Sequence, residues 1–323
     1  MKIILLIGEE VDKLKIAVLY GGVSKEREVS ISSSKGIIEA LKKNGHEVVA
    51  IDFHPDSLHE LIDLQVDLVF IGLHGKFGED GCIQGMLDML DIPYVGSGVL
   101  ASSLAMDKFM AKKMFASEGI LVAKDKRYHI NSKTDIAPII AEIKASFSVP
   151  FVVKPNREGS TLGLTIVNDE AEIEKAIKLA NLSDEYILVE QFIQGKELTV
   201  PVLGKQGEEE ALPIIEIIPK NELYDYEAKY AENGSEHVIP ARINNELTEQ
   251  IKQQAVKAHQ VLGCKTYSRA DFLLTDEGEA YILEVNTLPG MTSTSLFPDA
   301  AKTIDISYEQ MIERFVQLTV SNA

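Results

Sequence analysis

From residue 15 onward, the first third of the chain alternates between apolar, strand-like segments and amphipathic, helix-like segments. We expect strands at about 16–20, 47–52 and 67–73, and helices at about 30–43, 58–64 and 83–90. Repeated strand–helix units with short connections predict a parallel, doubly wound sheet. Ligands of such sheets bind at the carboxyl ends of the strands. The loops at 21–28 and 74–81 follow two of these strands, so we expect both to face a ligand.

Length and charge limit the classes of function. A chain of 323 residues predicts two or three domains rather than one core. The formal net charge of −18 argues against binding to nucleic acid or to an anionic membrane, because both are polyanions. A nucleotide in a pocket is still compatible with this charge, since a few lysines and a metal ion can reverse the local field.

The cysteines and the amino terminus indicate a cytoplasmic protein. Cys82 and Cys264 lie far apart in the sequence, and we expect both to be reduced core residues. The apolar run at 3–7 is too short for a secretion signal, and acidic residues follow it. No segment is long and apolar enough to span a membrane. Residues 1–13 receive no predicted role.

The segment 269–289, RADFLLTDEGEAYILEVNTLP, reads as a β-hairpin that turns at Glu277-Gly278. With a two-residue turn, Asp271 lies opposite Glu284 and Arg269 lies opposite Asn286, all on one face of the sheet. Two facing carboxylates repel unless a cation lies between them. An Asp, Glu and Asn set suits a hard cation such as Mg²⁺, which shares its coordination with phosphates. A solvent-facing hairpin with scattered charges is the alternative, but the flanking residues are apolar.

A second group of residues indicates phosphate binding. The chain has no G-x-x-x-x-G-K-[ST] motif, which excludes a P-loop enzyme. Lys154 ends a predicted strand and precedes a loop with two glycines, so its ammonium group and the loop amides can surround phosphate oxygens. Lys108 follows the turn at 106–107, and Glu190 and Glu197 bracket a hinge-like FIQGKE segment. Each charge alone is typical of a surface, but together with the hairpin they predict ATP held between two domains.

With these residues in place, the sequence resembles the ATP-grasp superfamily and, within it, the D-alanine–D-alanine ligases. The resemblance rests on GGVSKEREVS at 21–30, LHGKFGEDG at 73–81, MDK at 106–108, VVKPNREGS at 152–160, DYEAKY at 225–230 and EVNTLPGMTSTSL at 284–296. It implies an N-terminal α/β domain at 1–106, a central ATP-grasp lid at 107–194 and a C-terminal ATP-grasp domain with the metal site at 195–323. It also implies ligation of two D-alanines through an acyl phosphate, for peptidoglycan precursor synthesis.

The resemblance assigns roles residue by residue. ATP would be bound by Lys108, Lys154, Glu190, Gln191, Ile193 and Glu197, and two Mg²⁺ ions, replaceable by Mn²⁺, by Asp271, Glu284 and Asn286. Substrate and catalytic contacts would come from Glu26, His74, Ser160, Lys229, Tyr230, Arg269, Gly290, Ser295 and Leu296. The loop at 224–240 would close over the reaction. The resemblance further implies a homodimer that acts on D-alanine at both substrate positions.

Several residues also have simpler interpretations. Glu26 could cap the following helix, His74 could be a turn residue, Ser295 could begin a helix, and Tyr230 could pack within its loop. Two other functions remain open at this point: an ATP-grasp ligase for a different acid and amine or thiol, and a nucleotide-binding module without catalysis. The presence of Arg269 together with the three oxygen ligands disfavours the second. The Lys229-Tyr230 pair favours an amide product over an ester with D-lactate.

Overall fold

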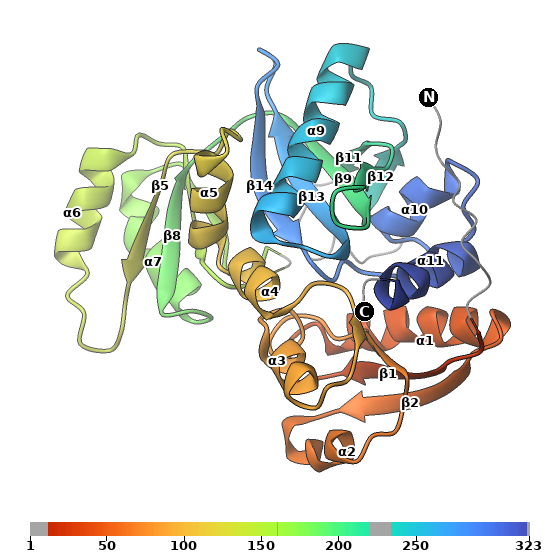
Figure 1. Cartoon of the computed structure of the whole chain (residues 1–323). Coiled ribbons are helices and arrows are strands. Elements are labelled where there is room, and N and C mark those ends of the chain that lie inside the picture. Colours follow the sequence, from red (N-terminus) through yellow and green to blue (C-terminus); the bar gives the residue numbers. More distant parts are fainter. Residues whose placement is uncertain (1–11, 160, 220–233, 322–323) are drawn as a thin grey trace.

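The computed structural model describes residues 12–159, 161–219 and 234–321 (Figure 1). The chain forms three β-sheets in these ranges, and each sheet carries its own helices. The N-terminal unit lies at the bottom of Figure 1, the central unit at the left, and the C-terminal unit at the upper right. The expected α/β class is confirmed.

The N-terminal sheet has the strand order β2-β1-β3-β4, and all neighbouring strands are parallel. Its elements are β1 (Lys15–Gly21), α1 (Arg27–Lys43), β2 (Glu47–Phe53), α2 (His59–Ile62), β3 (Leu68–Ile71), α3 (Cys82–Met89), β4 (Tyr94–Val95) and α4 (Val99–Met106). The central residues of β1 are fully buried, as expected for a parallel strand covered on both faces. The predicted parallel sheet is therefore confirmed, with α1 beginning three residues earlier than predicted.

The central unit is a four-stranded antiparallel sheet in the order β5-β8-β6-β7. It contains β5 (Asp125–His129), α6 (Ala137–Ser146), β6 (Phe151–Pro155), β7 (Thr165–Val167), α7 (Ile173–Asn181) and β8 (Tyr186–Gln191). Apolar side chains of both helices pack on the sheet, among them Ile143, Ile173 and Ile177. This small core belongs to the central unit alone.

The C-terminal sheet follows the order β12-β11-β9-β13-β14, with β10 paired to β9. Its elements are β9 (Lys196–Gly204), β10 (Glu210–Ala211), β11 (Ile215–Pro219), β12 (Ser235–Val238), α9 (Asn245–Leu262), β13 (Thr266–Leu274), β14 (Ala280–Asn286), α10 (Leu296–Lys302) and α11 (Tyr308–Val320). The predicted closing loop falls mostly on residues 220–233, outside the described ranges. Residues 235–238 form β12 rather than loop.

The C-terminal helices join the first and third units. Tyr267 of β13 stacks on Phe315 of α11 with ring centroids 4.2 Å apart, and it contacts Phe297 of α10 edge-on. These rings belong to the same apolar cluster as Leu19 and Phe70 of the N-terminal sheet. Burying each large side chain contributes about 1.5–3 kcal/mol, so this shared core holds α11 firmly against α1.

Helix α5 (Lys108–Ser117) connects the central and C-terminal units. Its apolar residues Ala111 and Phe115 are buried in the same cluster as α9 and β13. We propose three domains with a boundary near residue 107, and the core of the C-terminal domain includes α5.

The two cysteines differ in burial. Cys264 is buried as expected, but Cys82 is exposed at the start of α3, so its predicted place in the core is wrong.

The hairpin of β13 and β14 has the predicted pairing at its functional end but not the predicted turn. Arg269 pairs with Asn286, and Asp271 pairs with Glu284. The loop spans five residues, 275–279, and the pairing at the far end is shifted by one residue. A β-bulge next to Asp271 and Phe272 absorbs this shift, since Phe272 pairs with Ile282. The bulge therefore restores the register that a two-residue turn would have given.

Candidate active site

A cavity of about 520 Å³ lies where the three units meet. Its walls include Glu26 and Glu79 from the N-terminal unit, Lys108 and Gly159 from the segments around the central sheet, and Glu284 and Asn286 from β14. The cavity thus brings together residues that lie more than 250 positions apart. Both predicted ligand-facing loops of the N-terminal sheet reach it.

The predicted metal ligands lie beside two cations. The Nε and Nη2 atoms of Arg269 donate to the Asp271 carboxylate at 2.9 and 2.8 Å. Asn286 Nδ2 donates to the same carboxylate at 3.0 Å, and Lys108 Nζ lies 3.0 Å from Glu284 Oε2. The repulsion predicted between the two facing carboxylates is therefore offset by a guanidinium and an ammonium group.

The donor chemistry of this set fits a hard cation. Glu284 and Asn286 lie at one cavity wall beside a lysine suited to phosphate, and Asp271 is hydrogen-bonded to Asn286. In the described ranges no three His, Cys, Asp or Glu side chains converge as a complete metal site. An incomplete protein set is what Mg²⁺ requires when phosphate oxygens and water supply its other ligands.

Lys108 begins α5, and its head group contacts the loop at 156–159 that follows β6, here called the β6 loop. Its Nζ donates to the Glu158 carbonyl oxygen at 2.7 Å. Burial alone would lower the pKa of Lys108, but the neighbouring Glu284 and Glu190 more than compensate, so this pKa lies above its ordinary value. The side chain therefore stays a cation at the cavity wall.

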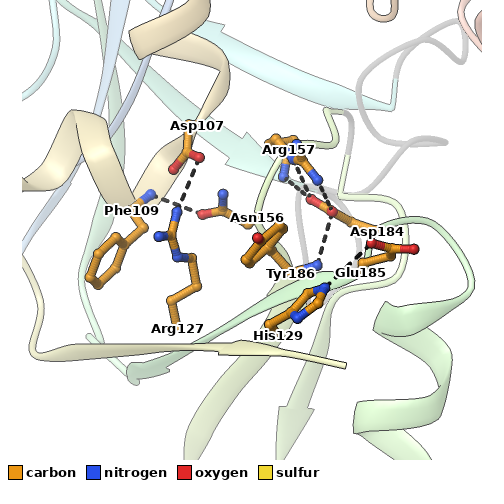
Figure 2. A network of polar contacts seen from close by, with 9 residues as sticks. All are labelled: Asp107, Phe109, Arg127, His129, Asn156, Arg157, Asp184, Glu185 and Tyr186. Atoms are coloured by element: carbon orange, nitrogen blue, oxygen red, sulfur yellow. Dashed lines mark hydrogen bonds and ion pairs between the residues drawn. The ribbon is translucent and has the colours of Figure 1, made fainter. Parts of the chain in front are cut away.

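Figure 2 shows the contacts that fix the start of the β6 loop. The Asp184 carboxylate accepts three hydrogen bonds from Arg157. The donors are the Arg157 backbone N at 2.9 Å, Nε at 3.1 Å and Nη2 at 2.6 Å. Asn156 Oδ1 accepts from the backbone N of Phe109 at 3.0 Å. Since Phe109 follows Lys108 directly, one network holds both the lysine and the loop in place.

Glu190, at the end of β8, lies between two lysines. Lys154 Nζ from β6 is 2.5 Å from its Oε2, and Lys112 Nζ from α5 contacts its Oε1. Burial would raise the pKa of Glu190, but Lys154 and Lys112 lower it to about 2. Lys112 also lies 2.9 Å from Asp125 Oδ2 on β5. The carboxylate is therefore ionised and fixed in the interior. The sequence interpretation missed Lys112.

The predicted hinge lies between β8 and β9. Gln191 is exposed, Ile193 is buried, and Glu197 lies on β9 opposite Ile217. A side chain on Gly195 would place its Cβ 2.4 Å from the carbonyl oxygen of Leu274. The hinge backbone therefore rests directly on β13, and only glycine fits there.

Glu26 lines the cavity, and His74 is buried next to the lining residue Gly75 in the neighbouring loop. Ser24 joins the loops, because its hydroxyl donates to the His74 carbonyl oxygen at 2.7 Å and accepts from the Glu26 backbone N at 3.1 Å. Glu26 occupies the N-cap position of α1. Among the described residues of the first turn, its side chain accepts no capping hydrogen bond. Its carboxylate lies beside Gly75 and Gly159 instead.

His74 is buried and uncharged. Burial lowers the pKa of His74, an effect that Glu26 only partly opposes. Its Nε2 has no hydrogen-bond partner in the part of the chain that the structure describes. Such a buried nitrogen is costly unless a ligand completes it, which favours a substrate contact over a turn residue.

Glu79 is a cavity residue to which the sequence interpretation gave no role, although it lies within the LHGKFGEDG motif. Its Oε2 accepts from the Gly75 backbone N at 2.6 Å. Burial and the nearby Glu26 raise the pKa of Glu79 to about 8. The cavity therefore holds a protonated carboxyl group at neutral pH beside a carboxylate.

The loop before α10 carries the remaining candidates. Ser295 is the N-cap residue of α10, and its Oγ accepts from the Thr292 backbone N at 3.0 Å. A side chain at Gly290 would meet this Oγ at 3.3 Å, so the two residues are close neighbours. Leu296 is buried at the start of α10. Ser160, Lys229 and Tyr230 lie outside the described residues, and their roles stay predictions.

The fold and the cavity together define an ATP-grasp ligase. Family models described as the N-terminus and C-terminus of D-ala D-ala ligase match residues 15–61 and 56–97, and residues 114–317. The chain belongs to the D-alanine–D-alanine ligase family.

Individual relatives extend over nearly the whole chain. A D-alanine–D-alanine ligase from Halalkalibacterium halodurans is 57% identical over 308 residues, covering 95% of this chain and 99% of the relative. One from Carboxydothermus hydrogenoformans is 47% identical, covering 94% and 98%.

Solved structures agree. The D-alanine–D-alanine ligase from Bacillus anthracis complexed with ATP has a TM-score of 0.81 at 31% identity, covering 96% of this chain and 98% of that one. The VanG D-Ala:D-Ser ligase from Enterococcus faecalis has a TM-score of 0.83 at 33% identity, covering 95% and 99%.

Proposed function

We propose that this cavity performs the family's reaction: the ligation of two D-alanine molecules to D-alanyl-D-alanine, with ATP converted to ADP and phosphate. The product would supply peptidoglycan precursor synthesis. One observation carries the proposal. Lys108 and Glu284, suited to phosphate and metal, share a cavity with Glu26, suited to an amino-acid ammonium group. The phosphoryl donor and a small zwitterion can therefore meet in one enclosed space.

ATP would bind between the central and C-terminal units. Lys108 and Lys154 would contact its phosphates, while Glu190, Gln191 and Ile193 would frame adenine and Glu197 would hold the ribose. The ionised state of Glu190 supports this assignment, since a fixed carboxylate accepts hydrogen bonds from an amino group. Lys154 pairs with Glu190 in the free protein, so it would exchange part of this contact for phosphate.

Asp271, Glu284 and Asn286 would hold two Mg²⁺ ions, for which Mn²⁺ could substitute. These ions would offset the negative charge of the β- and γ-phosphates during transfer. Two cations of the protein hold the carboxylate ligands in position: Arg269 pairs with Asp271, and Lys108 pairs with Glu284.

In the first step, a carboxylate oxygen of the first D-alanine would form a bond to the γ-phosphorus, and the bond from this phosphorus to ADP would break. Glu26 would hold the ammonium group of this D-alanine, with His74 in contact. The products of the step are an acyl phosphate and ADP. Activation is needed because a carboxylate is a poor acyl donor at neutral pH.

In the second step, the deprotonated amine of the second D-alanine would attack the acyl carbon, phosphate would leave, and the nitrogen would lose one proton to this phosphate. Ser295 and the Leu296 backbone would hold its carboxylate. Arg269 and the backbone N–H of Gly290 would stabilise the oxyanion of the tetrahedral intermediate, an effect worth about 3 kcal/mol for one donor. From the resemblance, Ser160, Lys229 and Tyr230 would complete this substrate site.

We also propose that the protein is cytoplasmic and that it forms a homodimer. Sedimentation analysis would test the homodimer. Its substrates, ATP and free D-alanine, fit a cytoplasmic location. None of the helices in the described ranges is long and apolar enough to cross a bilayer.

Product analysis tests the reaction. The protein is incubated with ATP, Mg²⁺ and D-alanine, L-alanine or no amino acid, and the products are identified by mass. Dipeptide and phosphate with D-alanine alone would support the proposal, and ATP turnover without any dipeptide would refute it. Because a D-Ala:D-Ser ligase is among the similar structures, D-serine and D-lactate are offered in competition. We expect D-alanyl-D-alanine as the main product; a predominant D-lactate ester would contradict the amide specificity.

A further inference from the structure

The loop that carries Gly290 is held by side chains from two helices, α1 and α11. The backbone N of Met291 donates to Ser33 Oγ of α1 at 3.2 Å, and the Tyr308 hydroxyl of α11 donates to the Met291 carbonyl oxygen at 2.6 Å. Both polar backbone groups of the residue after Gly290 are thereby bonded. Met291 itself is 2% exposed and Ser33 is 1% exposed, so water offers no substitute partner.

Gly290 needs such anchoring because glycine does not restrict its own backbone torsions. The direction of its N–H depends on the peptide planes on both sides. Pro289, on one side, has a fixed φ. On the other side, the plane between Gly290 and Met291 contains the N–H that Ser33 binds. Further back, Leu288 is buried in the apolar cluster shared with the N-terminal sheet. Residues 288–291 are therefore fixed at both ends.

We propose that Ser33 and Tyr308 are positioning residues for ligation, because they orient the oxyanion-binding N–H of Gly290 through the backbone of Met291. This inference rests on the proposed function. It means that α1 and α11, which carry Ser33 and Tyr308, help to set the direction of the oxyanion-binding N–H. Neither residue touches the reacting atoms. Their effect would be on the direction of one donor, to which electrostatic stabilisation of a transition state is sensitive.

The surroundings of Tyr308 support a specific hydroxyl contact over simple packing. A side chain at Gly36 of α1 would place its Cβ 3.0 Å from the Tyr308 hydroxyl oxygen, so α1 leaves room for this group. Burial raises the pKa of Tyr308, which keeps the hydroxyl protonated and able to donate. A phenylalanine would fill the same apolar space but could not bind the Met291 carbonyl oxygen.

Two substitutions with matched controls test the proposal. Tyr308→Phe and Ser33→Ala each remove one anchoring oxygen. Tyr281→Phe removes a hydroxyl that bonds Glu279 at the hairpin surface, and Ser32→Ala removes an exposed hydroxyl from the same helix as Ser33. For all five proteins, three quantities are measured: kcat for dipeptide formation, KM for ATP, and the exchange of ¹⁸O between bridging and non-bridging positions of ATP during reversible acyl phosphate formation.

We expect Tyr308→Phe and Ser33→Ala to lower kcat for the dipeptide about tenfold, because a misdirected donor loses part of its effect. KM for ATP and the exchange rate should stay within about twofold of wild type, since the first step does not need this oxyanion. Both controls should match wild type. Thermal unfolding shows whether each variant is folded, and either anchoring variant alone suffices for the test.

Kinetics of both anchoring variants equal to those of their controls would overturn the inference, whatever the change in melting temperature. Equal losses in exchange and in dipeptide formation would also overturn it, since they would indicate a general disturbance of the cavity. A wild-type protein that forms no dipeptide would refute the proposed function first, and this inference with it.

Discussion

Lys108 on α5 and Glu284 on β14 form an ion pair of 3.0 Å at the wall of the cavity. Beside it, Arg269 and Asp271 form a second pair with two hydrogen bonds. Each pair couples a residue proposed for phosphate or oxyanion binding to one proposed for metal binding. The free protein thus keeps its site charges balanced, and ATP with its metal would replace these partners rather than enter a site of bare charge.

This arrangement sharpens the expected effect of Asp271→Asn. Since Arg269 already offsets the carboxylate, the substitution should destabilise the fold by about 1–3 kcal/mol rather than relieve repulsion. Turnover should fall more, by at least about 100-fold. Losing a residue that hydrogen-bonds to a metal ligand already lowers activity by up to about that factor, and losing the ligand itself should cost at least as much. Mn²⁺ binding measured by electron paramagnetic resonance should weaken in parallel. Asp276→Asn in the exposed hairpin loop is the control; unchanged Mn²⁺ binding in Asp271→Asn would show that the ligand assignment is wrong.

Lys112 and Lys113 give a matched pair on α5. The Lys112 side chain is 1% exposed and contacts both Glu190 and Asp125, whereas Lys113 is 55% exposed and lies 3.6 Å from Asp125. Lys112→Met leaves two buried carboxylates without a shared cation and should cost about 3–5 kcal/mol of unfolding free energy. Lys113→Met should cost less than about 0.5 kcal/mol. Urea denaturation measures both values.

The same pair of variants separates the roles of the two lysines in nucleotide binding. ATP affinity, measured by calorimetry under conditions where both variants are folded, should fall for Lys112→Met and stay unchanged for Lys113→Met. Equal stability of the two variants would contradict the interpretation of Lys112 as the buried partner of Glu190.

Glu79 gives a prediction for pH. Its pKa is raised to about 8, first by burial and then by Glu26. When the pKa of a group is higher in the folded than in the unfolded protein, its contribution to the free energy of unfolding is complete below the ordinary pKa, here near 4.5. This contribution is lost as the pH rises to about 8. In that window, wild type should lose up to about 1.4 kcal/mol per pH unit from this group. Glu79→Gln should remove this slope.

Urea denaturation of wild type, Glu79→Gln and the exposed control Glu277→Gln from pH 5 to 9 measures the effect. The difference between wild type and Glu79→Gln should grow with pH, and Glu277→Gln should follow wild type. Parallel curves for wild type and Glu79→Gln would show that Glu79 is ionised throughout.

The residues of the hairpin show how far sequence reasoning reaches. Alternation alone was enough to place Arg269, Asp271, Glu284 and Asn286 on one face, because side chains on a strand alternate strictly. The turn was wrong, since turn type depends on local torsions that Glu277-Gly278 did not fix. The pairing was still right because the bulge near Phe272 compensates for the five-residue loop.

Other residues lay beyond that reach. In the sequence FMAKK, nothing distinguishes Lys112 from Lys113; only the packing of α5 on the central sheet buries one of them. Glu79 was part of a recognised motif, but its raised pKa arises from tertiary burial beside Glu26. Likewise, the contact of Ser33 with Met291 joins segments 258 residues apart, and Tyr308 reaches Met291 only because α11 folds back beside this loop. Local sequence predicted which elements form, whereas these environments required the assembled fold.

The central claim is that an acyl phosphate of D-alanine forms in this cavity. The most direct measurement uses D-alanine labelled with ¹⁸O in its carboxylate, together with unlabelled ATP and Mg²⁺, and determines the mass of the released phosphate. If the carboxylate attacks the γ-phosphorus, one ¹⁸O atom passes from each first-site D-alanine into phosphate as the dipeptide forms. Dipeptide accompanied by unlabelled phosphate would contradict the mechanism.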